Sequence, residues 1–229
     1  MATQLRVVLV HGAWADGSSW SKVIPLLEAE GFEVTAAQLP LSSLADDAAV
    51  TRNLLSMRDV PTVLVGHSYG GAVISEAASN IGNVVALVYI AAFAPDTGES
   101  LGGIFSRQAA PAGAQSIRPQ PNGLLWIDPA LFRESFAQDC SEADARLMAA
   151  VQKPIAGRCF EDTVTVPAWK TIPSWYQISE NDHMIPPEAQ RWMAERMKAT
   201  TISLPASHAS LVSSPIEITR LIADAAASS

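Results

Sequence analysis

Residues 63–71 read Val63-Leu64-Val65-Gly66-His67-Ser68-Tyr69-Gly70-Gly71 and place a G-x-S-x-G pattern directly after a short apolar run. In this setting the pattern predicts a sharp strand-to-helix turn that strains the serine backbone and raises its hydroxyl above the sheet. Gly66 and Gly70 leave room for such a turn. Three fixed positions match by chance in about one chain in ten of this length. The alternative is a plain glycine-rich turn, and the surrounding sequence must decide.

Strand and helix patterns alternate on both sides of this turn. Before position 94, apolar β-branched segments predict strands at 5–10, 32–38, 61–65 and 84–91, with helices at 20–30, 46–57 and 69–80. After position 167, strands are predicted at 174–178 and 200–204, and helices at 187–198 and 215–227. Units of this kind predict an α/β fold with about six mainly parallel strands and helices on both faces.

The stretch 95–167 interrupts the alternation. It is rich in glycine and proline, and it contains two helix candidates, at 129–138 and 142–151. Asp128 and Ser141 are the predicted N-caps of these two helices. We interpret 95–167 as a cap inserted into a core domain formed by residues 1–94 and 168–229.

Composition narrows the class of partner. The chain has 229 residues, a net charge of −8 and a pI of about 4.9, which argues against nucleic acid or an anionic membrane. No metal-ligand spacing, secretory leader or membrane-spanning run is visible, so we expect a cytoplasmic protein without metal or cofactor. Two free thiols are expected, although a disulfide between Cys140 and Cys159 stays open.

Ser68 would need a general base, and that base an orienting acid, to act as a nucleophile. Asp182 follows the strand predicted at 174–178, and His208 follows the strand predicted at 200–204. The carboxyl ends of parallel strands share one edge of the sheet, where ligands bind. We therefore predict Ser68 as nucleophile, His208 as base and Asp182 as acid, with Glu180 as the alternative acid.

The other histidines are given no part in the chemistry. His11 is expected to matter through its backbone, and His67, inside the elbow, to point away from the serine oxygen. His183 is interpreted as a solvated loop residue.

An oxyanion formed by serine attack needs backbone N–H donors. We predict the amides of Tyr69, directly after the nucleophile, and of Ala13, in the loop after the first strand. Gly12 would permit a backbone conformation there that a Cβ would resist.

These residues together resemble an α/β-hydrolase. The closer resemblance is to the subfamily of plant methylesterases and hydroxynitrile lyases, with residues 20–31 similar to its first helix, 131–136 to its cap and 182–192 to the stretch that carries its acid. The resemblance covers nearly the whole chain. It implies a six-stranded, mainly parallel α/β-hydrolase sheet, and it suggests a homodimer.

Two departures favour the esterase branch of that subfamily. Its lyases carry threonine where Gly12 stands, and a lysine that helps hold departing cyanide where Ala209 stands. We therefore predict a serine carboxylesterase that hydrolyses small hydrophobic or aryl esters through an acyl-enzyme. The alternatives are a hydroxynitrile lyase, a ligand receptor on the same fold that barely turns over, and a perhydrolase using the same serine.

The predicted substrate pocket is apolar. Core packing is the alternative for each of its candidate residues, which are Gly12, Trp14, Leu125, Trp126, Phe132 and Phe136.

Overall fold

Six parallel strands form the centre of the fold in the computed structural model, which describes residues 5–107 and 109–228. Their order across the sheet is β2-β1-β3-β4-β8-β9. The predicted α/β sheet of about six strands is confirmed. The central strands read as continuous apolar runs because helices cover both faces. The strands are β1 (Arg6–Val10), β2 (Glu33–Ala36), β3 (Thr62–His67), β4 (Val84–Ile90), β8 (Ser174–Ser179) and β9 (Thr200–Leu204).

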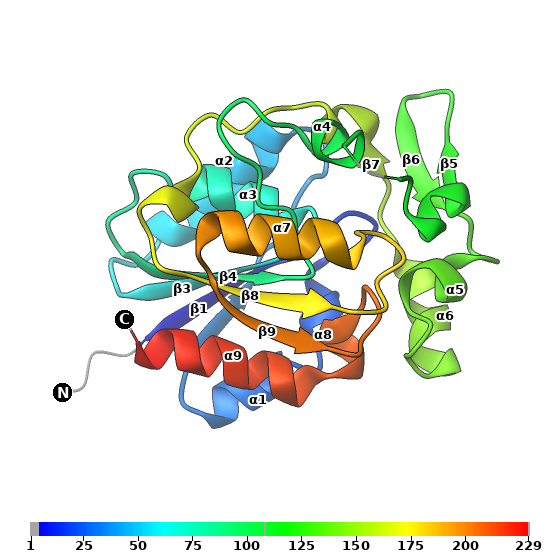
Figure 1. The fold of residues 1–229 in the computed structure, drawn as a ribbon. Helices are drawn as coiled ribbons and strands as arrows, with labels where there is room; N and C mark the ends of the chain where they lie inside the picture. The colour runs from blue at the N-terminus through cyan, green and yellow to red at the C-terminus, as the bar shows by residue number, and fades with distance from the viewer. Residues whose placement is uncertain (1–4, 108, 229) are drawn as a thin grey trace.

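Helices lie on both faces of this sheet (Figure 1). One face carries α2 (Leu44–Ser56), α3 (Gly70–Ala77) and α7 (Pro187–Met197), and the other carries α1 (Ile24–Ala29) and α9 (Pro215–Ala227). A single helix was predicted at 20–30. The structure has a 3-10 turn, η1 (Gly17–Trp20), followed by the short helix α1. Pro25 occupies the first turn of α1, where its missing N–H costs no hydrogen bond.

The chain between β4 and β8 lies beside the carboxyl ends of the strands (Figure 1). It contains a three-stranded antiparallel sheet that the sequence pattern did not predict, because strands of two to four residues carry too little periodicity. Its elements are α4 (Leu101–Phe105), η2 (Ala112–Ser116), β5 (Ile117–Pro119), β6 (Leu124–Ile127), α5 (Phe132–Phe136), α6 (Glu142–Val151), β7 (Ile155–Ala156) and η3 (Gly157–Phe160). The turn η4 (Ala168–Lys170) leads into β8.

The two helices predicted in this segment differ in outcome. Helix α6 has the predicted bounds, and the Ser141 hydroxyl caps it by accepting from the amide of Asp144 at 3.1 Å. Helix α5 is shorter than predicted, and Asp128 is not its cap. The Asp128 carboxylate instead accepts from the amide of Ala130 at 3.0 Å in a tight turn, so the helix begins only at Phe132.

Cys140 and Cys159 are both buried free thiols. Burial raises the pKa of each to about 12, so the reactive thiolate is scarce near neutral pH. Within the described residues, no helix has the length and apolar character needed to cross a bilayer.

Candidate active site

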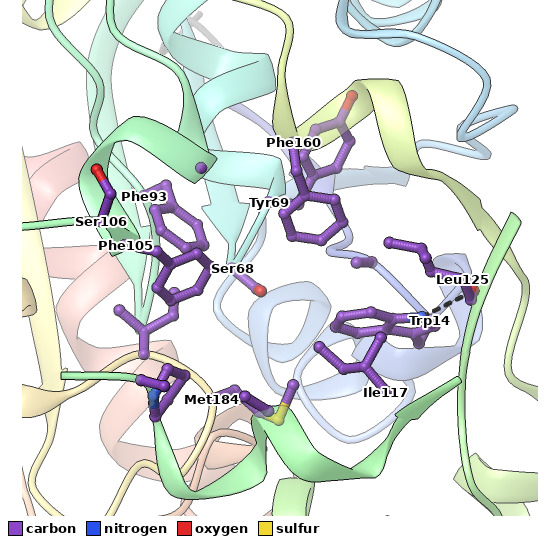
Figure 2. Close-up of a pocket in the computed structure, with 16 residues that line it drawn as sticks. Trp14, Ser68, Tyr69, Phe93, Phe105, Ser106, Ile117, Leu125, Phe160 and Met184 are labelled. Atoms are coloured by element: carbon purple, nitrogen blue, oxygen red, sulfur yellow. Dashed lines mark hydrogen bonds between the residues drawn. The ribbon is translucent and has the colours of Figure 1, made fainter. Parts of the chain in front are cut away.

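Ser68 lies at the turn between β3 and α3 in a strained backbone conformation. Its φ is +54°, in the left-handed region that L-residues with a Cβ rarely adopt. The turn is held by the Ser68 carbonyl, which accepts from the amides of Gly71 and Phe93 at 3.0 Å each. A Cβ on Gly66 would lie 2.6 Å from the Gly70 carbonyl oxygen, so this tight turn requires glycine at position 66. The Ser68 hydroxyl points into a cavity (Figure 2).

His208 and Asp182 form a buried pair at the same edge of the sheet. Nδ1 of His208 lies 2.7 Å from Oδ2 of Asp182, and both side chains are almost fully buried. A carboxylate only accepts, so Nδ1 carries the proton and Nε2 of the neutral ring holds the lone pair. That Nε2 is buried and has no hydrogen-bond partner among the described residues. It is therefore free to take a proton.

The Asp182 carboxylate accepts four hydrogen bonds, which fix its orientation. Oδ1 accepts from the amides of Met184 at 2.7 Å and Ile185 at 2.9 Å. Oδ2 accepts from His208 and from Nε2 of Gln190 at 2.8 Å. Gln190 is fully buried in α7, and no sequence motif pointed to it.

Geometry also decides between the two candidate acids. Glu180 pairs with Arg191, with its side chain about one-third exposed, and makes no bond to His208. His183, next to Asp182, is half-buried, and its Nδ1 lies 2.9 Å from the Glu134 carbonyl. Neither residue joins the buried pair.

His67 has a larger part than the sequence suggested. Its ring packs against the His208 ring at a centroid distance of 4.8 Å, and its Nε2 donates to the His208 carbonyl at 2.8 Å. Burial lowers the pKa of His67 well below 6.5, so the ring stays neutral. His67 thus holds the loop that contains His208 next to Ser68.

Ala13 and Tyr69, whose backbone amides are the predicted oxyanion donors, line the same cavity as Ser68. Neither N–H donates to a protein acceptor in the part of the chain that the structure describes. Two unpaired amides beside a serine hydroxyl are suited to receive an oxyanion.

Gly12 lies so close to Ser68 that no side chain fits between them. An added Cβ would stand 2.6 Å from Ser68 Cβ and 3.0 Å from the His67 carbonyl oxygen. We predicted that a special backbone conformation explains this glycine, which is wrong. Left-handed φ values occur among the described glycines only at Gly31, Gly98 and Gly123, and Gly12 serves close approach instead.

Gly12→Ala is expected to lower kcat/KM about 100-fold, because the added methyl must displace Ser68 from its reactive position. Steady-state hydrolysis of a p-nitrophenyl ester measures the loss. Gly82→Ala is the matched control, since its Cβ would meet nothing within 4 Å. Equal rates for the two variants would contradict the expectation.

The ring of His11 holds the loop that carries Ala13. Nε2 accepts from the Leu39 amide at 3.1 Å, so Nδ1 carries the proton and donates to the Gly12 carbonyl at 2.9 Å. The sequence interpretation, in which only the His11 backbone mattered, missed this role. Burial lowers the pKa of His11 to about 4, and the ring is neutral at physiological pH.

Acid should therefore destabilise the protein through His11. Unfolded His11 has a pKa near 6.5, so between pH 6.5 and 4 the unfolded state binds more protons and stability falls as pH falls. From pH 7 to pH 5 this contributes a loss of about 2 kcal/mol in the free energy of unfolding. Urea unfolding of wild type and His11→Asn at both pH values isolates the contribution. A difference between the two proteins that is constant with pH would contradict it.

A cavity of about 490 Å³ opens above Ser68, within the size range of small-molecule sites. Figure 2 shows Phe93 and Phe105 on one side of the hydroxyl and Trp14 and Ile117 on the other. The Trp14 indole N–H donates to the Leu125 carbonyl at 3.0 Å, which ties the Ala13 loop to β6. None of the described residues that line the cavity is charged.

Trp14 and Leu125 line this cavity, but the other four predicted pocket residues do not. Side chains alternate along a strand, so Trp126 faces the side of β6 opposite to Leu125, over Arg133 and Ala149. Phe132 and Phe136 border a smaller hollow behind His208, and Phe136 packs edge-on against the His208 ring at 4.7 Å. Gly12 lies close to Ser68 but does not line the cavity.

Several lining residues were missed. Phe93, Met184 and Ile185 follow the carboxyl ends of β4 and β8, so the rule that placed Asp182 also applied to them. Phe105 ends α4 and Phe160 ends η3, two short helical segments that the sequence pattern did not predict. Within the described residues, no three His, Cys, Asp or Glu side chains gather where they could hold a metal ion.

Comparison with known proteins agrees with this geometry. A family model described as the alpha/beta hydrolase family matches residues 7–220. The chain belongs to this family. The predicted family and fold are therefore confirmed.

Curated relatives of this alpha/beta hydrolase include ester hydrolases. The pyrethroid hydrolase of Sphingobium wenxiniae is 29% identical over 97% of this chain and 88% of its own length. Salicylic acid-binding protein 2 of Nicotiana tabacum is 28% identical over 84% of this chain and 85% of its own length. Methylesterase 1 of Arabidopsis thaliana is 27% identical over 85% of each chain. The protein is thus an alpha/beta hydrolase of the esterase type.

Solved structures give the same result. The crystal structure of a pyrethroid hydrolase from Sphingobium faniae superposes with a TM-score of 0.86 at 26% identity, over 97% of both chains. Polyneuridine aldehyde esterase superposes with a TM-score of 0.82 at 22% identity, over 96% of this chain and 98% of the other, which supports the fold.

Proposed function

We propose that this alpha/beta hydrolase is a serine carboxylesterase that hydrolyses small hydrophobic or aryl esters through an acyl-enzyme. The observation that carries the proposal is the strained Ser68, whose hydroxyl opens into an apolar cavity beside the buried His208–Asp182 pair. A strained backbone at a cavity is a frequent mark of a functional residue.

The proposed reaction begins when Nε2 of His208 takes the Ser68 proton and Oγ bonds to the ester carbonyl carbon. The carbonyl oxygen becomes an oxyanion that accepts from the Ala13 and Tyr69 amides. As the carbon–alkoxy bond breaks, His208 returns the proton to the departing alcohol. His208 then takes a proton from water, and the resulting hydroxide bonds to the acyl carbon. As the bond between this carbon and Ser68 Oγ breaks, the acid leaves and Ser68 recovers its proton from His208.

Asp182 has two tasks in this scheme. Its bond to Nδ1 keeps the lone pair of His208 on Nε2, where the serine proton must arrive. Its charge also stabilises the imidazolium that forms during each half-reaction. Hydrogen bonds from the Met184 and Ile185 amides and from Gln190 hold the carboxylate in place during both half-reactions.

The cavity supports a neutral, apolar substrate. No charged side chain among its described lining residues could compensate the desolvation of a substrate carboxylate or ammonium group. Aromatic rings on both sides of Ser68 suit hydrophobic groups on either side of the ester carbonyl (Figure 2). No metal or cofactor takes part in the scheme.

Assays on the purified protein test the proposal. We expect steady hydrolysis of p-nitrophenyl acetate and butyrate, and at least about 10-fold lower kcat/KM for p-nitrophenyl hemisuccinate, which adds a carboxylate at similar size. Faster release of cyanide from mandelonitrile than of nitrophenolate would favour a hydroxynitrile lyase. Tight binding without steady-state turnover across the ester series would favour a receptor.

A further inference from the structure

Both amides of the proposed oxyanion hole are anchored to the short segment Leu39–Leu41, which follows β2. Leu39 donates its amide N–H to His11 at 3.1 Å, and Leu41 donates its own to Oδ1 of Asp47 at 2.8 Å. Leu41 has a φ of +60°, an uncommon conformation for leucine. We call residues 39–41 the anchor segment.

One arm of the anchor segment reaches Tyr69. Asp47 is fully buried in the first turns of α2, and its Oδ2 accepts from the Tyr69 hydroxyl at 2.7 Å. That hydroxyl is directed away from the cavity (Figure 2), so it is not placed to contact substrate. The side chain of Tyr69 is thereby held at its far end, and the residue itself lines the cavity beside Ser68.

The other arm reaches Ala13. His11 donates from Nδ1 to the Gly12 carbonyl, and this carbonyl belongs to the same peptide plane as the Ala13 N–H. Because a peptide unit is planar, fixing its carbonyl also fixes the direction in which its N–H points. A hydrogen bond to the carbonyl additionally polarises the amide and strengthens the N–H as a donor.

The cap holds the anchor segment from the opposite side. Nζ of Lys153 donates to the Leu39 carbonyl, and the amide of Ala156 in β7 donates to the Leu41 carbonyl at 2.9 Å. Both amides of the oxyanion hole are thus linked to the cap by chains of hydrogen bonds through buried groups.

We propose that Asp47 and His11 are positioning residues that aim the two oxyanion-hole amides, and that the anchor segment joins both to the cap. The proposal rests on the function proposed above. Its physical basis is preorganisation: the donors act only if they already point at the site where charge develops.

Tyr69→Phe is the sharpest probe, since it removes the hydroxyl bonds to Asp47 and Cys159 and leaves the backbone amide and the ring. Loss of a whole donor costs roughly 100- to 1,000-fold, so loss of its anchor is expected to lower kcat about 10-fold with KM unchanged. Tyr89→Phe is the matched control, because it deletes an equally buried hydroxyl, bonded to Ser75 at 2.8 Å. It should retain wild-type kinetics.

Inhibitor binding separates aiming from mere structural support. A trifluoromethyl ketone, which forms an oxyanion on Ser68, should bind Tyr69→Phe more weakly by the same factor as the loss in kcat/KM. A control ketone of equal size, which stays uncharged because it forms no adduct with Ser68, should bind wild type and Tyr69→Phe equally. Equal weakening of both ketones, or Tyr69→Phe kinetics matching those of Tyr89→Phe, would overturn the proposal.

Lys153→Met tests the link to the cap, because it keeps the apolar stem and removes the bond to Leu39. It should weaken trifluoromethyl ketone binding selectively, as Tyr69→Phe does. Unchanged binding would overturn the link. Asp47→Asn provides a second probe of the Asp47 arm if Tyr69→Phe does not fold. Should Ser68→Ala remain fully active, the proposed function itself fails, which is a separate outcome.

Discussion

Replacing Ser68 by alanine is expected to lower kcat/KM for p-nitrophenyl butyrate by about 10³- to 10⁶-fold, the range for loss of a serine nucleophile. The physical reason is that no other described group at the cavity can form the acyl-enzyme. Ser106, which also lines it, is exposed and donates its hydroxyl to the Gly103 carbonyl at 2.8 Å. The amides of Ala13 and Tyr69, which we propose bind the oxyanion, remain in this variant, so residual activity above the uncatalysed rate is expected.

Two measurements make this experiment decisive. Mass spectrometry after rapid quenching should find an acyl adduct on wild type and none on Ser68→Ala. Ser106→Ala serves as the control, since it also removes a hydroxyl at the cavity. A Ser68→Ala protein with wild-type rates would show that the elbow serine is not the nucleophile.

His208→Ala should lose about 10³-fold or more in kcat, because Ser68 would then have no base for its proton. The loss should appear mainly in kcat, since His208 is buried behind the cavity wall and is not placed to hold substrate in the ground state. Steady-state kinetics at pH 7 and pH 9 measure it.

His183→Ala is the control for this variant, since it removes the same ring from the neighbouring loop. The His183 ring bonds to the Glu134 carbonyl and has no other hydrogen-bond partner among the described residues. We expect kinetics close to wild type. If His183→Ala lost as much activity as His208→Ala, the assignment of the base would be wrong.

Much of the fold could be predicted because local pattern and tertiary role agree in the core. The strand β9 and the helices α6 and α9 have the predicted bounds. Apolar spacing marks all three elements, and Ser141 and Pro215 mark where the two helices start. The cap was harder. Strands such as β7, with two residues, form because neighbouring strands pair with them, and their own sequence does not specify them.

The site shows the same division. Ser68, Asp182 and His208 could be proposed because each follows a strand end, and parallel strands bring those ends together. Gln190, Asp47 and the ring of His11 contribute through contacts across 8 to 28 positions in the sequence. No spacing rule reports such contacts. Phe132 and Phe136 were predicted to line the substrate pocket because they are aromatic. Their rings instead pack behind His208.

The uncharged cavity has a consequence for the end of the catalytic cycle. In the proposed reaction, a neutral ester enters a space without compensating charge, and hydrolysis turns its acyl half into a carboxylate in that same space. The product anion is poorly solvated there, and water outside offers it a better environment. The same uncharged lining that favours binding of the neutral ester therefore disfavours binding of the acid product. We expect rapid product release and weak inhibition by accumulated product.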